Sequence, residues 1–422
     1  MNKIEHTSAG GVNFEPNKKL GYYLLGNEIY YNKFQALLAE ARQTEHKVKW
    51  FFNDHVFFKT PWTQEPNVAL TELYRQRAQQ LREKYDYIML AASGGADSTS
   101  VIHSFLLNGI HLDEIVFRYP KQGEKNMVGN AGDTTCENTL AEWDYAAKPL
   151  FDWVSTNFPD TKLTVQDYTD DLLTNELNRD ESWVFKSRHF LHPCYPNKHN
   201  TLALKENREL ADTGKSICVL YGIDKPKICI KDGKFFIYFV DAPTGEHNPD
   251  VGDYTNITNE FFYWTPDFPE ILVKQAQVIK NWFSMPQNHH LQHLLHWPNH
   301  GFNKRTVYEY MVKSLIYPTY DSNTFQVAKS SNNIYSEMDQ WFHTNFADTQ
   351  LYQSWQAGVN YILDNINEEH VSIVKGRRSN ITMFNSSFYY LGDSTIPVPA
   401  TTTLPIDKHV YNHVISGRLV TY

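Results

Sequence analysis

The stretch AASGGADSTS at residues 91–100 combines small, polar and glycine residues in a way that suits phosphate binding. Ser93 and Ser98 supply hydroxyl donors, and Gly94 and Gly95 let the backbone come close to a ligand. A helix is expected to begin at about Ser98, so its free amide groups and its dipole favour a negative charge at this point. We therefore predict that this loop binds phosphate groups.

Asp97 adds a requirement to that prediction. A carboxylate beside a phosphate is repulsive unless a metal ion lies between them. A polyphosphate bound with Mg²⁺ meets both conditions, and Asp97 is then the expected magnesium ligand. Ala96 and Thr99 complete the loop, and we count both among the expected nucleotide-binding residues. The loop is not a Walker A motif, which needs a lysine, and it does not follow the G-x-G-x-x-G pattern.

The segments around this loop predict an open parallel sheet with helices on both faces. YIMLAA, directly before the loop, is an apolar run of strand length, and a helix closed by Gly109 follows. Further strands are expected in DEIVFRYP, KLTVQDYT and SICVLYGI, with helical segments between them. This alternation indicates a parallel α/β sheet with right-handed crossovers. Ligands of such sheets bind at the carboxyl ends of the strands, where this loop lies.

The chain of 422 residues is long enough for three parts. Residues 1–64 are expected to form a small α/β lead-in with a hairpin, which turns at Gly26-Asn27, and a helix. Residues 65–245 form the expected nucleotide-binding domain, and their last segment is a hairpin that turns at Asp232-Gly233. Residues 246–422 contain several amphipathic, aromatic-rich segments, so we expect a mostly helical domain there.

A buried strand that ends in S-G-G-x-D-S resembles the PP-loop of the ATP pyrophosphatase superfamily, whose members include asparagine synthetase and PAPS reductase. The resemblance covers about residues 80–230 and implies an adenine nucleotide alpha-hydrolase-like fold. It also implies an enzyme that binds ATP and Mg²⁺ and cleaves ATP between the α and β phosphates. An acceptor becomes adenylated, and a nucleophile then displaces AMP. The motif positions that would hold the departing pyrophosphate are Ser93, Gly94, Gly95, Asp97 and Ser98.

Two further strand ends carry residues that the resemblance places near the nucleotide. Arg118 and Tyr119 end the second strand, which borders the adenosine in this superfamily, although Arg118 could equally be a solvated edge residue. Gly222 ends the fourth strand and allows close backbone approach. Lys225 is expected to neutralise charge on the α-phosphate, with an ordinary surface lysine as the alternative. Several relatives carry Gly-Ile-Arg near this point, and Asp224 stands here instead of the arginine.

The cysteines separate this chain from the known branches of the superfamily. Asn2 occupies the position of the catalytic cysteine of asparagine synthetase-like amidotransferases, so no built-in glutaminase is expected. Sulfonucleotide reductases use a C-terminal cysteine, and no cysteine follows Cys229. The four cysteines form no C-x-x-C pair, so neither a disulfide framework nor a zinc site is expected.

Three segments leave their roles open. The glycine-rich loop 121–138 is either a lid or a disordered excursion. The segment 188–194, RHFLHPC, lacks a fourth zinc ligand and is expected to face substrate or to serve the fold. On an α-helix one face would carry four histidines, for which a solvated or partner-facing stripe is favoured over a metal site. These histidines are His289, His293, His296 and His300.

Charge and hydropathy limit the function classes. The formal net charge of −9 argues against a broad polyanion-binding surface, so a nucleic-acid acceptor is open but not supported. No apolar run approaches the ~18 residues of a membrane helix, and the first residues lack a signal-peptide core, so we expect a cytoplasmic protein. Two alternatives to the adenylating enzyme remain. One is a PAPS reductase-like nucleotide- or sulfonucleotide-binding protein without the reductase cysteine, and the other is a non-catalytic interaction protein on the same fold.

Overall fold

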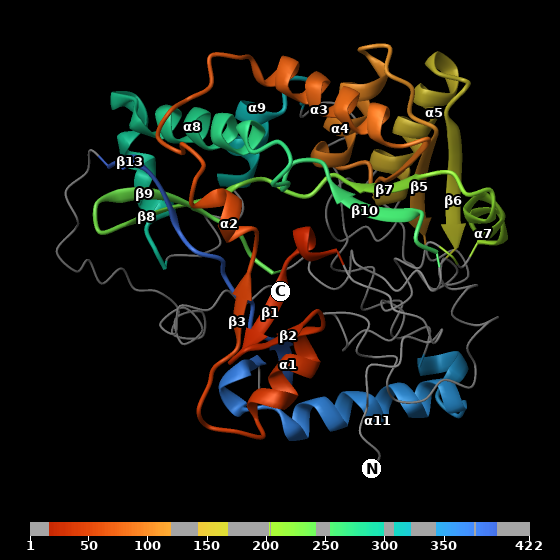
Figure 1. The fold of residues 1–422 in the computed structure, drawn as a ribbon, viewed down its shortest axis with the longest axis vertical. Helices are drawn as coiled ribbons and strands as arrows, with labels where there is room; N and C mark the ends of the chain where they lie inside the picture. Colours follow the sequence, from red (N-terminus) through yellow and green to blue (C-terminus); the bar gives the residue numbers. More distant parts are fainter. Residues whose placement is uncertain are drawn as a thin grey trace.

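A five-stranded parallel sheet organises the chain, and Figure 1 shows it edge-on below a layer of helices. The order of its strands is β10-β7-β4-β5-β6. The computed structural model describes residues 17–119, 142–167, 202, 204–241, 254–298, 308–321, 343–374 and 377–394. The strands of this sheet are β4 (Tyr87–Ala91), β5 (Glu114–Tyr119), β6 (Lys162–Asp167), β7 (Ile217–Tyr221) and β10 (Ile257–Phe261).

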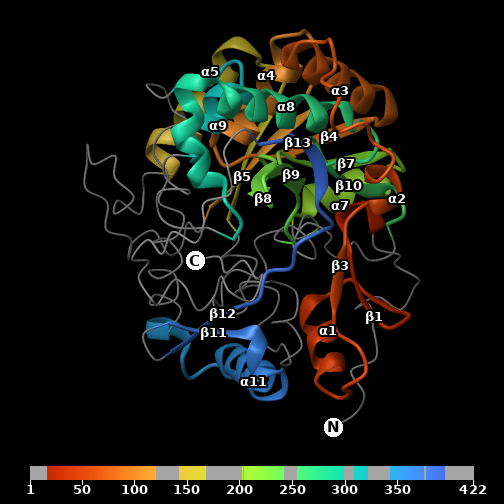
Figure 2. The same cartoon turned by 90° about the vertical axis from the view of Figure 1, so that its left-hand side faces the viewer.

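Helices cover both faces of the sheet, as the alternating pattern predicts. In Figures 1 and 2, α3, α4 and α5 lie above the sheet and α7 lies below it. The central strands β4 and β7 are therefore apolar on both faces, and all five residues of β7 are buried. The bounds of these helices are Leu70–Lys84 for α3, Ala96–Leu106 for α4, Lys148–Asn157 for α5 and Lys205–Asp212 for α7.

Helix α4 begins within two residues of the position that its sequence predicts. α4 begins at Ala96, two residues before the expected start, and Gly109 follows it with a φ of 68°. The helical segment expected between β5 and β6 contains, in its described part, a π-helical segment, Trp143–Ala147, followed by α5. Pro149 is the second residue of α5 and has no N–H to donate, which accounts for the change of helix type there.

Strand β10 belongs to the main sheet although it lies beyond residue 245, where a mostly helical domain is expected. Its sequence ITNEF lacks an apolar run, yet Glu260 is only 2% exposed. The Glu260 carboxylate accepts hydrogen bonds from Arg77 and Lys84 on α3 and from Tyr85 just after it. Because these partners come from a distant part of the chain, the strand could not be recognised from its own residues. The predicted nucleotide-binding part, 65–245, thus takes its fifth strand from beyond its expected boundary.

A second sheet joins the hairpin before residue 245 to a strand near residue 390. Its order is β13-β9-β8. The hairpin turns at Asp232-Gly233, as predicted, with φ values of 50° and 72°. The strands are β8 (Lys227–Lys231), β9 (Lys234–Tyr238) and β13 (Tyr389–Asp393).

The part after residue 245 also contains the helices expected there. They are α8 (Glu270–Ser284), α9 (Glu309–Ile316) and α11 (Gln350–Asn365). One 3₁₀ helix, η6 (Pro286–Leu295), follows α8, and another, η8 (Glu368–His370), precedes the two-stranded sheet of β11 (Val371–Val374) and β12 (Arg377–Ile381). Within the described residues, no helix has both the length and the apolar character needed to cross a bilayer.

In the described part of the predicted lead-in, residues 17–64, a small antiparallel sheet is joined by helices. Gly26 turns the hairpin with a φ of 59°, and the side chain of Asn32 accepts hydrogen bonds from the amides of Phe34 and Gln35 to cap α1. Figure 2 shows α1 on the same side of the main sheet as α11 and β12. The elements are η1 (Lys18–Leu20), β1 (Tyr22–Leu25), β2 (Glu28–Tyr30), α1 (Lys33–Glu40), β3 (Lys49–Phe51) and α2 (Asp54–Phe57).

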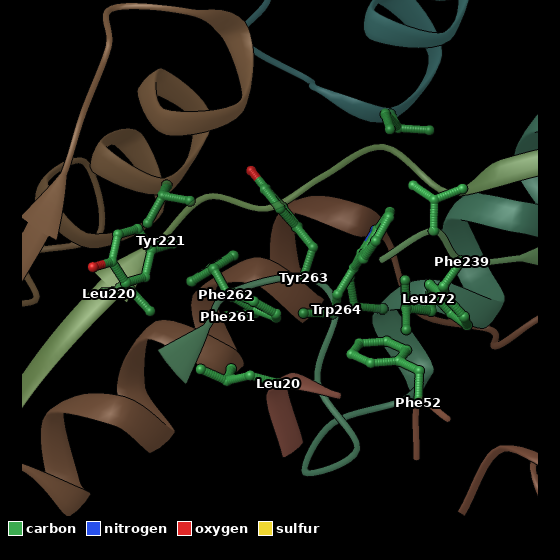
Figure 3. Close-up of a cluster of buried hydrophobic side chains, with 14 of the residues drawn as sticks. Leu20, Phe52, Leu220, Tyr221, Phe239, Phe261, Phe262, Tyr263, Trp264 and Leu272 are labelled. Carbon is green, nitrogen blue, oxygen red and sulfur yellow. The ribbon is translucent and has the colours of Figure 1, made fainter. Parts of the chain in front are cut away.

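One aromatic core connects these parts. Figure 3 shows Phe52, Phe239 and Trp264 packed together, and these residues come from the segments that follow β3, β9 and β10. The ring centroids of Phe52 and Phe239 are 4.9 Å apart, and those of Phe239 and Trp264 are 5.1 Å apart. A buried ion pair between Lys33 and Asp241, at 2.7 Å, adds a polar link between α1 and the segment after β9.

Glu40 forms a second polar link, between α1 and the segment around His370. Its side chain is buried and accepts hydrogen bonds from the Val48 amide at 2.6 Å, His370 at 2.9 Å and Lys47 at 3.0 Å. Burial raises the pKa of the Glu40 carboxyl, but these hydrogen bonds lower it by more, so the pKa falls to about 2. Ligand atoms of Glu40, Glu369 and His370 lie within 4.8 Å of one another. The Lys47 ammonium lies 3.0 Å from Glu40 and 2.6 Å from Glu369 and so supplies positive charge to this cluster.

We expect Glu40→Gln to destabilise the protein at neutral pH and to change its response to acid. A carboxyl whose pKa is about 2 when folded, against an ordinary 4.5, stabilises the fold above about pH 4.5. This contribution is lost as the pH falls from 4.5 towards 2. Thermal unfolding at pH 7, 4.5 and 3 should show a lower midpoint for the variant at pH 7 and a smaller further loss between pH 4.5 and 3.

Glu209→Gln is the matched control, because it removes the same charge from an exposed pair with Lys205 on α7. Exposed pairs contribute little, so its midpoint should stay close to that of the wild type. Equal shifts for the two variants would contradict the structural role of Glu40.

Candidate functional site

A cleft of about 250 Å³ lies at the carboxyl ends of β4, β5 and β7. From β6 to β10, with the strands numbered by their position along the chain, the order is 3-2-1-4-5. The strands that follow β4 are first added on its β5 side, and from β7 onwards they are added on its other side, so the order reverses between β4 and β7. This reversal is the topological switch point at which doubly wound sheets bind their ligands. The polar residues that line the cleft are Ser93, Asp97, Ser98, Arg118, Glu142, Tyr221 and Asp224.

The first turn of α4 presents free amide groups beside this cleft. Gly95 is the N-cap residue and has no side chain to accept a hydrogen bond from the turn. The Ser98 hydroxyl accepts a hydrogen bond from the Ser93 amide at 3.3 Å and donates one to the Gly95 carbonyl at 3.2 Å. Ser98 thus holds the loop in shape while it lines the cleft. The result is an uncapped helix N-terminus, which favours an anion.

The two glycines of the loop, Gly94 and Gly95, are not among the residues that line the cleft. Gly94 has a φ of +67°, and a Cβ added there would lie 2.4 Å from the Ala146 carbonyl carbon and 2.5 Å from the Ala147 nitrogen. Gly94 is therefore required by the close approach of the π-helical segment before α5. Gly95 is buried as well. The glycine pair did indicate a close backbone contact, but the contact is with the protein itself.

Two more expected nucleotide-binding residues belong to the interior. Ala96 is 2% exposed and Thr99 is fully buried, and neither lines the cleft. The amide of Thr99 makes the first hydrogen bond of α4, to the Gly95 carbonyl at 3.0 Å. Both residues anchor the first turn of α4 rather than face a ligand.

Gly222 lies at the opposite wall of the cleft, directly after β7. A Cβ at this position would lie 3.2 Å from the Asp97 carbonyl carbon and from the Ser98 nitrogen. The close approach predicted for Gly222 is therefore with the first turn of α4. This contact places the end of β7 against the loop that follows β4.

Asp97 and Lys225, which the sequence separates widely, meet at the cleft. The Lys225 ammonium lies 3.3 Å from both carboxylate oxygens of Asp97 and 3.0 Å from Asp224. Tyr317 donates a hydrogen bond to the Asp97 carboxylate, and Tyr263 donates one to the Asp97 carbonyl at 3.1 Å. Lys225 is 7% exposed, so it is not an ordinary surface lysine.

Asp224 belongs to the same charged group. Burial raises the pKa of its carboxyl, and the charges of Lys225 and Lys227 lower it by more, so the pKa lies below its ordinary value. Asp224 is therefore a carboxylate at neutral pH. Together with Asp97 it gives the β7 side of the cleft two carboxylates around one buried ammonium.

Arg118 lies on the β5 side of the cleft and is 7% exposed. Its Nε and Nη2 atoms are buried and have no hydrogen-bond partner. Arg118 is therefore not a solvated edge residue. Tyr119 is the last residue of β5 and pairs with Asp167 of β6.

Two residues of this site, Glu142 and Tyr317, were not predicted from the sequence. Glu142 is 7% exposed and lines the cleft from the segment before α5, and Tyr317 reaches Asp97 from the end of α9. Neither residue lies in a motif. Glu142 precedes a helix in a segment that was interpreted only as helical, and Tyr317 is 220 residues away from its partner.

Three of the four histidines predicted to share a helix face lie in the described residues. Residues 286–295 form a 3₁₀ helix, in which residues three apart align, and His296 follows its end, so the predicted α-helical stripe of His289, His293 and His296 does not form. His289 contacts the Ser284 carbonyl, and His293 contacts that of His290. His300, the loop 121–138 and the segment 188–194 lie outside the described residues.

Comparisons with known proteins assign no family to the chain. No protein-family model matches it, and no curated protein matches it significantly. The site is therefore interpreted from its own geometry.

We expect Gly94→Ala to destabilise the protein more than Gly109→Ala. Both glycines have nearly the same positive φ, 67° and 68°, so both variants carry backbone strain of about 1–3 kcal/mol. Only the alanine at 94 overlaps another backbone, since nothing lies within 4 Å of a Cβ at Gly109. Overlap of this kind costs about a further 1–3 kcal/mol. Urea unfolding of the two variants would measure the difference, and equal losses would contradict the packing role of Gly94.

Proposed function

We propose that the cleft binds ATP with Mg²⁺ and that the protein transfers AMP to an acceptor with release of pyrophosphate. The observation that carries this proposal is the uncapped first turn of α4, which presents free amides beside Asp97 at the switch point of the sheet. Such a turn suits the phosphates of a nucleotide. The resemblance of S-G-G-x-D-S to a PP-loop supplies the reaction type, with cleavage between the α and β phosphates.

The loop has hydroxyl and amide donors but no cation of its own. Ser93 and the first-turn amides of α4 can donate hydrogen bonds to the departing pyrophosphate. The negative charge of the pyrophosphate must then be neutralised by a group from outside the loop. Lys225 is the nearest described cation on the β7 side, but two carboxylates already surround it. A divalent cation is therefore needed in addition.

The donor set at Asp97 fits such a cation. Asp97 and Asp224 are carboxylates, the oxygen ligands that Mg²⁺ prefers, and both line the cleft. When bound, Mg²⁺ neutralises the charge on the phosphates. Lys225 would give up its contact with Asp97 to the metal ion and would then be free to turn towards the nucleotide. Tyr317 would keep the Asp97 carboxylate in place through its hydrogen bond.

This reaction asks little covalent chemistry of the protein. The acceptor oxygen attacks the α phosphorus, the bond to the bridging oxygen breaks, and pyrophosphate leaves with the bonding electrons. The chain's contribution is to position the phosphates and to stabilise the charge that develops on them.

Asp97→Asn should abolish Mg²⁺-dependent pyrophosphate release from ATP, with a loss on the order of 10²-fold or more. The asparagine keeps the size of the side chain but removes the charge that would hold the metal ion. Pyrophosphate, AMP and ADP would be measured with ATP, MgCl₂ and a pool of small metabolites as acceptors. Asp152→Asn, on the exposed side of α5, is the control and should release pyrophosphate at the wild-type rate.

Formation of ADP instead of AMP would contradict the proposed cleavage, and wild-type turnover by Asp97→Asn would contradict the role of Asp97. Thermal-shift measurements distinguish the alternatives, because a ligand raises the unfolding midpoint by mass action. A larger shift with a 3′-phosphorylated sulfonucleotide than with ATP would favour the sulfonucleotide-binding protein.

A further inference from the structure

Arg118 carries a charge that the described structure leaves uncompensated. A guanidinium keeps its proton at any physiological pH, and this one is buried with Nε and Nη2 unpaired. No hydrogen bond or ion pair joins it to Glu142, although both residues line the cleft. A buried charge without partners is strongly unfavourable. Such an arrangement is understandable where a ligand supplies the missing partner.

The two unpaired atoms define the chemistry of that partner. Nε and Nη2 form one edge of the guanidinium, and their N–H groups point in parallel. This edge matches two oxygens of a phosphate or carboxylate, which it binds with two charge-assisted hydrogen bonds. The group that completes Arg118 is therefore an oxyanion.

The sheet places this edge one strand away from the loop after β4. Ala91 pairs with Val116, and the Ala92 amide donates to the Val116 carbonyl at 2.9 Å. Ser93 follows β4 by two residues and Arg118 follows Val116 by two residues in β5, and both line the cleft. Neighbouring strands are about 4.8 Å apart. A phosphate at Arg118 would thus be adjacent to the phosphates at the first turn of α4.

Lys225, the cation beside Asp97, is already paired with carboxylates. The Lys225 ammonium contacts both oxygens of Asp97 and one of Asp224. Arg118 is the described cation in the cleft lining whose donors are unpaired. The geometry points to Arg118, rather than Lys225, as the residue that binds the α-phosphate of the nucleotide. This inference rests on the proposed function, in which the loop holds the β and γ phosphates.

The inference is tested by the preference of the protein for AMP over adenosine, measured by isothermal titration calorimetry. The wild type should bind AMP more tightly by roughly tenfold to a hundredfold, the range expected for hydrogen bonds to a charged group. Arg118→Gln should reduce this preference to about onefold and leave adenosine affinity unchanged. Arg118→Lys should keep part of it. Arg75→Gln, an exposed arginine on α3, should keep all of it.

A second measurement separates ligand binding from a structural role. Because Nε and Nη2 have no partner to lose, Arg118→Gln should unfold at the wild-type temperature or above in the absence of ligand. A clear fall in the unfolding midpoint, or an unchanged preference for AMP in Arg118→Gln, would overturn the inference.

Pyrophosphate distinguishes failure of this inference from failure of the proposed function. Arg118→Gln should bind pyrophosphate as tightly as the wild type, since the loop after β4 is the expected site. If the wild type binds ATP and pyrophosphate but Arg118→Gln keeps its preference for AMP, only the assignment of Arg118 fails. If the wild type binds neither ATP nor pyrophosphate, the proposed function fails first and the inference with it.

Discussion

The candidate site depends on two places where the first turn of α4 and its loop touch other backbone without room for a side chain. Gly94 lies against Ala146 and Ala147, and Gly222 lies against Asp97 and Ser98, with would-be Cβ distances of 2.4 to 3.2 Å. These contacts fix the loop between the segment before α5 and the end of β7. The free amides of α4 are thereby held at the switch point of the sheet. A larger residue at either glycine would separate walls of the cleft that must stay together.

Charge is distributed unequally across the cleft that these contacts form. On the β7 side, Asp97, Asp224 and Lys225 neutralise one another in part, and Tyr317 adds a hydrogen bond. On the β5 side, Arg118 stands without a described partner for Nε and Nη2. An anion is therefore attracted to the β5 side, whereas a divalent cation can compete for the β7 side. A nucleotide that brings both phosphates and Mg²⁺ meets the two demands together, and this complementarity favours it over a bare anion.

Much of the fold could be predicted from the sequence because its signals are local. An apolar run followed by a glycine-rich turn identified β4, and the capping of α1 by Asn32 follows from one side chain and two amides. Strand β10 could not be found in this way. Its Glu260 is buried only because Arg77 and Lys84 from α3 neutralise it. Sequence periodicity does not report partners that lie more than 170 residues away.

The residues of the site also differ in whether a local sequence signal or only the fold reveals them. Asp97 was predicted from the chemistry of its own loop, whereas Tyr317 and Glu142 enter the site only through the fold. Gly94 was recognised as a point of close approach, yet the residue type cannot say whether a ligand or the protein approaches it. For Arg118 the sequence left a solvated edge residue and a nucleotide contact equally open. Burial excludes the first, and the unpaired Nε and Nη2 atoms are the observation on which the proposed phosphate contact rests.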